Sequence, residues 1–169
     1  MGRYRAPAEP KSPHITRAGY EALQAEQQQL WERRRDVVKH LSAAAAEGDR
    51  SENAEYIYRK KQLRELDRRI RYLQIRIPNL KIVDQPPDTA TQIFFGASVM
   101  LEDGKGETVS YRIVGADEFD PKRNWISIDS PMARALLKRH VDDSVSVQTP
   151  QGVIELTVLE VHYDEPSAD

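Results

Sequence analysis

The feature that most constrains the fold is an alternating three-four spacing of side chains in two stretches of the first half of the chain. The first stretch runs from Tyr20 to Ala44 and the second from Tyr56 to Ile77. Residues three and four apart share one face of an α-helix, so each stretch predicts a helix with a coiled-coil seam. The predicted seam residues are Tyr20, Leu23, Gln27, Leu30, Arg34, Val37, Leu41 and Ala44, followed by Tyr56, Arg59, Leu63, Leu66, Ile70, Leu73 and Ile77.

The ends of the predicted helices carry signals of their own. Thr16 is the expected N-cap of the first helix, and Pro78 is the expected stop of the second. With a short turn between them, two helices of about 30 residues would form an antiparallel hairpin about 45 Å long, at about 1.5 Å per residue. We therefore predict a coiled-coil hairpin over residues 14–83 with its tip at 47–53, preceded by a disordered tail over 1–13.

The second half of the chain has the patterning of a β-sheet. β-branched and aromatic residues are concentrated in stretches such as "ETVSYRIVG", "SVSVQT" and "VIELTVLEVHY", with turn sequences such as "TPQG" beside them. A short helix is expected in "SPMARALLKRH", where Ser130 suits the N-cap and Pro131 the first helical position. The fold class is therefore α+β, with a mostly antiparallel sheet and one short helix over residues 93–165. The proline-containing stretch 84–92 is the expected linker.

Charge divides the chain at the same place. Up to Asp84 there are 18 basic and 12 acidic residues, a net charge of +6, whereas from Gln85 onward there are 7 and 15, a net charge of -8. Halves of opposite charge indicate two domains with different partners. The chain has no cysteine, which excludes disulfides, zinc-thiolate sites and thiol chemistry. It has neither an apolar run of membrane-spanning length nor a signal-type start, so we expect a folded cytoplasmic protein.

The predicted tip, "EGDRSENAEY", gathers four carboxylates around one glycine. One interpretation is purely structural: Gly48 ends the first helix in the left-handed conformation, while Asp49 and Glu52 form a capping box for the second. That interpretation leaves Glu47 unexplained, because a carboxylate is unfavourable at the negative end of a helix.

The other interpretation is that Asp49 and Glu52 hold a hard cation. Carboxylate oxygens without a nearby histidine or cysteine suit Mg²⁺. Two carboxylates on an exposed turn are too few for a closed site, however. A catalytic metal at the tip would need further ligands from a partner with a deep channel.

A basic stripe follows the tip along the second helix. Its four members fall within about 80° of one another at about 100° per residue, and they are Lys60, Arg64, Arg68 and Arg71. The stripe is widened by Arg59, Lys61 and Arg69, and the facing helix adds Arg33, Arg34, Arg35 and Lys39. The stripe is either a solvated flank with salt bridges to Glu55, Glu65 and Asp67, or a track for a nucleic-acid strand whose end reaches a metal at the tip.

Several motifs occur in an order that resembles one family. They are "GDRSENAEY" at the tip, "KKQLRELDRRIRYL" on the second helix, "NLKIVD" at the hinge and "ISIDSPMARALL" in the second domain. Together they resemble the Gre family of bacterial transcript-cleavage factors, and Arg50 with the dense basic stripe resembles its GreB branch. The resemblance implies a coiled coil, a C-terminal domain of FKBP-like fold, and a factor that enters the secondary channel of RNA polymerase.

The resemblance also implies roles for particular residues. Asp49 and Glu52 match the family's tip carboxylates, which help the polymerase hold a second Mg²⁺ and activate water for hydrolysis of backtracked RNA. The protein would then be an accessory factor and not itself an enzyme, acting as a monomer on RNA polymerase and the RNA 3′ segment. Docking on the polymerase β′ subunit carries over to the region Asp129 to Leu137, in particular to Asp129, Ser130, Pro131 and Met132.

Two other functions remain open. A non-catalytic regulator that binds the same channel would not need Asp49 and Glu52 together with the basic stripe. A prolyl isomerase could share the fold of the second domain, since fold alone does not determine function. That activity needs an aromatic-lined apolar pocket, whereas the available aromatic residues are typical of a sheet core: Phe94, Phe95, Tyr111 and Trp125.

Overall fold

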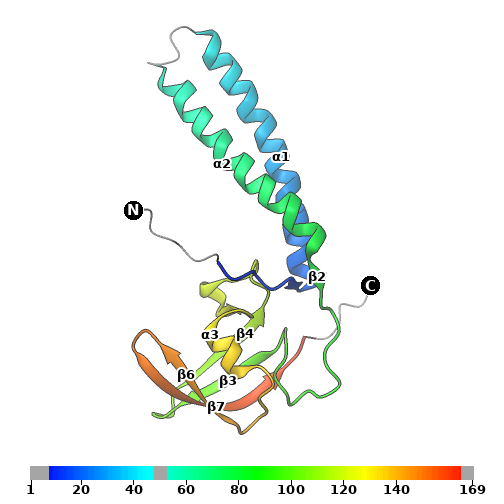
Figure 1. The fold of residues 1–169 in the computed structure, drawn as a ribbon, viewed down its shortest axis with the longest axis vertical. Coiled ribbons are helices and arrows are strands. Elements are labelled where there is room, and N and C mark those ends of the chain that lie inside the picture. The colour runs from blue at the N-terminus through cyan, green and yellow to red at the C-terminus, as the bar shows by residue number, and fades with distance from the viewer. Residues whose placement is uncertain (1–7, 48–52, 165–169) are drawn as a thin grey trace. The chain divides into compact units, whose positions relative to one another are not determined.

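The computed structural model describes residues 8–47 and 53–164 (Figure 1). Contacts between residues divide the chain into two compact units. The hairpin unit is Tyr20–Leu80, and the sheet unit combines the residues up to Gly19 with those from Lys81 onward. The predicted ranges of 14–83 and 93–165 differ from this division, because residues 14–19 and 81–92 group with the sheet unit. No helix in the described part of the chain is long and apolar enough to cross a membrane.

The hairpin unit is built from two antiparallel helices, α1 (Arg17–Ala46) and α2 (Ala54–Arg76), which lie side by side in Figure 1. Every predicted seam residue is buried or half-buried, as the three-four spacing requires. The most deeply buried residues of the two helices are Leu23, Val37, Ala44, Leu66, Ile70 and Leu73. The predicted coiled-coil hairpin is therefore confirmed.

The outer ends of the two helices follow the predicted signals. The Thr16 hydroxyl accepts a hydrogen bond from the Gly19 amide at 3.1 Å, which confirms Thr16 as the N-cap of α1. α2 ends at Arg76 and is followed directly by the short 3-10 helix η1 (Ile77–Asn79), which contains Pro78. Proline cannot continue an α-helix without losing a backbone hydrogen bond, so the predicted stop is also confirmed.

Asn53 joins the two inner ends of the hairpin. Its side-chain oxygen accepts a hydrogen bond from the Tyr56 amide at 3.0 Å, which makes Asn53 the N-cap of α2. Its Nδ2 donates to the Ala44 carbonyl at 2.8 Å, near the end of α1, where carbonyls lack partners within the helix. The structural interpretation of the tip gave this role to Asp49, and the structure gives it to Asn53. Asparagine before a helix is also a capping signal. The sequence interpretation chose Asp49 because the spacing of Asp49 and Glu52 matches the capping box.

The sheet unit contains a two-stranded and a five-stranded sheet. In the smaller one, β1 (His14–Ile15) pairs in parallel with β2 (Lys81–Ile82). The larger sheet has the strand order β5-β4-β3-β7-β6, in which β4 and β5 pair in parallel and the other neighbours are antiparallel. Its strands are β3 (Ser98–Asp103), β4 (Thr108–Val114), β5 (Trp125–Ser127), β6 (Ser144–Thr149) and β7 (Gly152–His162). The predicted, mostly antiparallel sheet is therefore confirmed.

The short helix α3 (Pro131–Leu136) packs against the larger sheet. Its N-cap is Ser130, whose hydroxyl accepts a hydrogen bond from the Ala133 amide at 3.2 Å, as predicted. Ala133 and Leu136 are fully buried in the core. The core residues from the rest of the unit are Ile93, Ala97, Val99, Leu101, Ile113, Val145, Val147, Leu156 and Val158. A second 3-10 helix, η2 (Pro121–Arg123), precedes β5.

The segment before α1 is attached to the sheet unit. Ile15 in β1 is completely buried, and the Pro13 carbonyl accepts a hydrogen bond from the Lys81 amide at 2.8 Å. The Ser12 amide donates to the Asp129 carboxylate at 2.9 Å, and Glu9 pairs with Arg134 at 3.1 Å. These contacts extend the folded unit into the range 1–13 that was predicted as a disordered tail.

Candidate functional site

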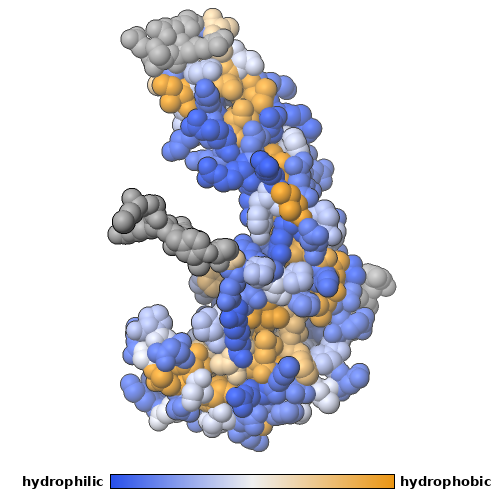
Figure 2. All heavy atoms as spheres, in the orientation of Figure 1, coloured by the Kyte–Doolittle hydropathy of each residue, from blue (hydrophilic) through white to orange (hydrophobic). Residues whose placement is uncertain are grey.

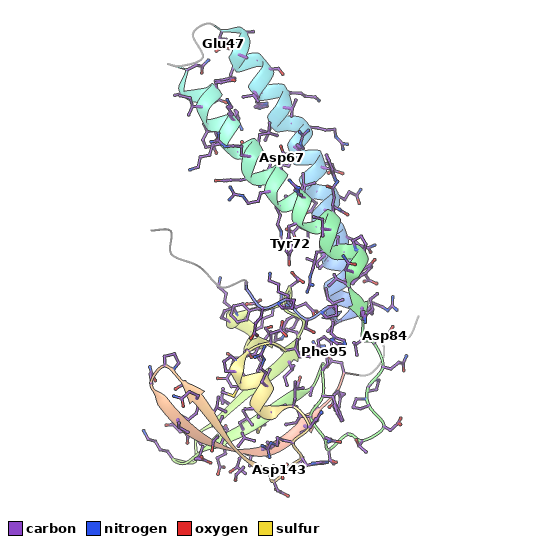
Figure 3. All side chains as sticks on the ribbon, viewed as in Figure 1. Glu47, Asp67, Tyr72, Asp84, Phe95 and Asp143 are labelled. Atoms are coloured by element: carbon purple, nitrogen blue, oxygen red, sulfur yellow. The ribbon has the colours of Figure 1, made fainter. Side chains whose placement is uncertain are left out.

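The tip carboxylates predicted to hold Mg²⁺, Asp49 and Glu52, lie outside the described residues. The structure describes both flanks, with the exposed Glu47 after α1 (labelled in Figure 3) and Asn53 before α2. Because Asn53 caps α2, the helix needs neither Asp49 nor Glu52 as its N-cap. Within residues 8–47 and 53–164, no group of three or more histidine, aspartate or glutamate side chains is suited to a metal ion. The binding of a metal by Asp49 and Glu52 stays a prediction. The alternative, in which they form the capping box of α2, loses its main support because Asn53 is the N-cap.

The basic stripe lies on the exposed side of α2. Lys60, Arg64, Arg68 and Arg71 are all exposed, and the space-filling view of the hairpin shows abundant hydrophilic surface (Figure 2). The Lys60 ammonium lies 5.8 Å from the centre of the Tyr56 ring. In the part of the chain that the structure describes, no carboxylate lies within ion-pair distance of the three arginines. Their positive charge is therefore not neutralised by the described carboxylates.

The acidic residues of α2 have other partners. Asp67, labelled in Figure 3, pairs with Arg34 of α1 at 2.6 Å. Glu55 pairs with Arg59 at 2.7 Å. Glu55 and Asp67 therefore form the salt bridges that the solvated-flank interpretation expected, but with the widening residue Arg59 and with Arg34 of α1 and not with the four members of the stripe.

Two of the residues expected to widen the stripe are engaged elsewhere. Arg59 lies in the seam, its side chain is only 24% exposed, and it donates hydrogen bonds to Glu55 and, at 3.1 Å, to Gln62. Arg69 pairs with Glu26 of α1 through two hydrogen bonds at 2.7 and 3.0 Å. The third residue expected to widen the stripe, Lys61, is exposed and lies beside the stripe.

The predicted docking residues differ in how accessible they are to a partner. Asp129 is half-buried and accepts the hydrogen bond from the Ser12 amide, while Ser130 is occupied as the N-cap of α3. Met132 packs against the hydrophobic core. Pro131 is exposed, and so is Arg134, one turn further along the helix. A partner that docks here would meet Pro131 and the edge of the segment bound at Asp129.

The four aromatic residues weighed for a prolyl isomerase pocket have separate surroundings. Tyr111 packs against the sheet core, and the guanidinium groups of Arg112 and Arg123 lie 5.1 and 5.0 Å from the centre of the Trp125 ring. The Phe95 ring is 6.0 Å from the His14 ring, and the Phe94 amide donates to the Tyr163 hydroxyl at 2.8 Å. These contacts agree with structural roles for all four residues.

A long two-helix hairpin with an exposed cationic stripe offers its charge to a phosphate backbone. Fold and site together define a class: a two-unit protein in which a helical hairpin with an exposed cationic stripe is joined to a separate sheet unit.

Comparison with known proteins identifies the family within that class. The family model "Transcription elongation factor, N-terminal" matches residues 14–82, and "Transcription elongation factor, GreA/GreB, C-term" matches residues 88–163. The transcription elongation factor GreB of Xanthomonas axonopodis pv. citri is 56% identical over 165 residues, covering 96% of this chain and 98% of that protein. GreB of Haemophilus ducreyi is 55% identical over 158 residues, covering 93% and 98% respectively. Among solved structures, GreA factor homolog 1 of Thermus thermophilus is 28% identical and covers 90% of this chain and 99% of that one, with a TM-score of 0.42.

The chain belongs to the GreA/GreB family of transcription elongation factors. The predicted family is thereby confirmed, and the curated relatives carry the name of the predicted GreB branch.

Proposed function

We propose that this elongation factor enters the secondary channel of RNA polymerase with its hairpin tip leading and stimulates the polymerase's own hydrolysis of backtracked RNA. Family membership supports RNA polymerase as the partner. The observation that carries the proposal is the exposed basic stripe on the helix that follows the tip. Because Arg64, Arg68 and Arg71 have no carboxylate partner among the described residues, their charge is available to RNA phosphates.

The tip carboxylates complete an active site that belongs to the polymerase. Asp49 and Glu52 provide oxygen donors, which suit Mg²⁺ when the polymerase contributes the remaining ligands. Asp49 and Glu52 would hold a Mg²⁺ ion there, which would supply Lewis-acid chemistry for polarising a phosphoryl oxygen and activating water. Since two carboxylates leave most of the coordination sphere unfilled, the protein alone has no cleavage activity and is an accessory factor.

The sheet unit docks on the rim of the channel, at the polymerase β′ subunit. The region Asp129 to Leu137 is the proposed contact, and within it Pro131 and Arg134 have exposed side chains. Docking is thus assigned to a different unit from the tip, so binding and cleavage are separable in experiments.

Substitution of the tip carboxylates tests the proposal. We expect Asp49→Ala or Glu52→Ala to lower stimulated cleavage at saturating factor by at least about 100-fold, because both residues act in the transition state. The factor concentration that gives half-saturation should stay unchanged, since docking lies elsewhere. The assay uses purified polymerase stalled in a backtracked complex, with Glu65→Ala, an exposed carboxylate on α2, as the matched control.

Full cleavage by both tip variants would exclude this mechanism. Binding without any stimulation by the unaltered protein would instead support a non-catalytic channel regulator.

A further inference from the structure

An exposed tyrosine, Tyr58, precedes the basic stripe on α2 and is connected through Lys61 to three of its members. Residues three and four apart on a helix are neighbours on its surface, and the steps from Tyr58 to Lys61, Arg64, Arg68 and Arg71 are three, three, four and three. All five residues are exposed. The line therefore begins with an aromatic side chain, near the start of α2, and continues with four cations, with the exposed Glu65 beside them.

The Tyr58 ring is held on one side and open on the other. The residue is 59% exposed, and the Arg59 guanidinium lies 5.4 Å from the ring centre. Arg59 is in turn fixed by Glu55 at 2.7 Å and Gln62 at 3.1 Å. A ring supported by an anchored cation loses less conformational freedom when a second flat group stacks on it.

We infer that Tyr58 is a nucleobase-stacking residue, and that its ligand is the single-stranded RNA that the basic stripe contacts. This inference rests on the proposed function and adds to it a contact with a base. Proteins that bind single strands combine a cationic track for the backbone with aromatic side chains for the bases. The line supplies both elements on the exposed side of α2.

The dimensions of the line agree with such a ligand. Thirteen residues separate Tyr58 from Arg71, which corresponds to about 20 Å along the helix. A stacked strand advances about 3.4 Å per nucleotide, so the line spans about six nucleotides. Tyr58 contacts the base that lies closest to the tip, where the carboxylates Asp49 and Glu52 lie in the sequence.

The first test measures RNA binding by the purified full chain without polymerase. Fluorescence anisotropy at low salt would compare an end-labelled RNA hexamer with the same hexamer made of abasic nucleotides. We expect Tyr58→Leu to weaken binding of the normal hexamer about tenfold, the effect of losing one stacked base, and Tyr58→Phe to bind like the unaltered protein. On the abasic hexamer, all three proteins should bind equally.

Trp31→Leu is the matched control. Trp31 of α1 is 38% exposed and also lies beside an anchored guanidinium, that of Arg34 at 5.9 Å, but it is on the other helix. We expect its substitution to leave RNA binding unchanged. Circular dichroism would establish that both leucine variants retain the helical content of the unaltered protein.

The second test uses the backtracked polymerase. Tyr58→Leu should lower cleavage without changing the factor concentration at half-saturation. Equal binding of the normal hexamer by Tyr58→Leu and the unaltered protein would overturn the inference. A loss of polymerase affinity in place of RNA affinity would also overturn it, because Tyr58 would then contact the channel wall. If the unaltered protein failed to stimulate cleavage, the proposed function would fail, while the hexamer experiment would still decide the stacking.

Discussion

At the residue scale, the attachment of the N-terminal segment depends on close approach between two stretches of backbone. The Glu118 carboxylate accepts hydrogen bonds from the Thr16 amide at 3.1 Å and the Gly115 amide at 2.8 Å, and the Thr16 hydroxyl also donates to it. A Cβ at Gly115 would lie 2.4 Å from the His14 carbonyl oxygen. Only a residue without a side chain fits there while β1 keeps its place beside β2.

Gly115→Ala should therefore destabilise the sheet unit. Because the obstructing atom belongs to the backbone, relief requires movement of β1, and we expect a loss of about 2 kcal/mol or more in the free energy of unfolding. Urea denaturation would measure it. Gly104→Ala is the control, since a Cβ added at Gly104 would meet no atom within 4 Å and the substitution should be nearly neutral. Equal stability of the two variants would contradict the close contact.

Tyr163 is a second residue whose surroundings predict a measurable effect. Its hydroxyl donates to the Gln92 carbonyl and accepts from the Phe94 amide. Burial raises the pKa of Tyr163 above 10.0, against a smaller lowering by the Phe94 amide. The folded state thus holds this proton more tightly than the unfolded state. The resulting stability is fully present below about pH 10 and is lost as the pH rises through the folded-state pKa.

Tyr163→Phe should remove this pH dependence. Below about pH 10 we expect the variant to be less stable by about 1 kcal/mol, because the hydroxyl's two hydrogen bonds are lost. At higher pH the difference between the two proteins should shrink, since only the unaltered protein loses the tyrosine contribution. Urea midpoints measured from about pH 8 to about pH 11 would show it. A difference that stays constant over this range would contradict the assignment.

At the scale of the elements, the cations of the hairpin form two groups: those in ion pairs between the helices and those of the exposed stripe. Ion pairs between α1 and α2 involve Arg34 with Asp67 and Arg69 with Glu26, so these cations serve packing. The basic stripe projects from the exposed side of α2. Exposed ion pairs contribute about 0–1 kcal/mol, so the helices are held together mainly by the buried seam. The stripe can therefore be changed without unfolding the hairpin.

Replacing the stripe should produce a defect that depends on RNA length. Glutamine at Lys60, Arg64, Arg68 and Arg71 preserves helix propensity but removes four phosphate contacts. We expect complexes backtracked by a few nucleotides to be cut almost normally and those with long extruded segments about tenfold more slowly, because only long segments reach the stripe. Raising the salt concentration should mimic this defect in the unaltered protein.

The matched control removes cations from α1 by glutamine substitution of Arg33, Arg35 and Lys39, all of which are exposed. Its effect should be smaller at every backtrack length. An equal effect of the stripe variant on short and long backtracks would exclude RNA guidance while leaving the proposed role of the tip intact.

At the scale of the whole molecule, the two halves of the chain carry net charge of opposite sign. The net charge is +6 up to Asp84 and -8 beyond it, and the family models divide the chain at nearly the same place. The contacts of Glu9, Ser12 and Ile15 nevertheless attach the start of the chain to the sheet unit. A fragment that begins at Asp84 would lack β1 and its buried isoleucine, so it would not reproduce the sheet unit.

The complete chain should bind Mg²⁺ only weakly in the absence of polymerase. Two carboxylates leave most of the coordination sphere to water, so Mg²⁺ at about 1–10 mM should shift the Tm by no more than a potassium salt of equal ionic strength. Differential scanning calorimetry would compare the two. A clear Mg²⁺-specific increase in Tm, or metal-dependent RNA cleavage by the protein alone, would show that the site is more complete than proposed.

The sequence by itself determined those features that depend on neighbours along the chain. The helical seam, the Thr16 and Ser130 caps and the stop at Pro78 follow from helix geometry, which repeats over three and four residues. The partial alternation of apolar and polar residues in the second half of the chain predicted a sheet, because successive side chains of a strand point to opposite faces. The motifs also indicated the family and the residues of the stripe.

Only the tertiary structure decided which distant residues meet. The choice of Asn53 over Asp49 as the N-cap depends partly on the Ala44 carbonyl of the other helix. The pairing of Ser12 with Asp129 likewise joins residues far apart in the chain. Local periodicity cannot specify such contacts, because they are set by the packing of whole elements against one another.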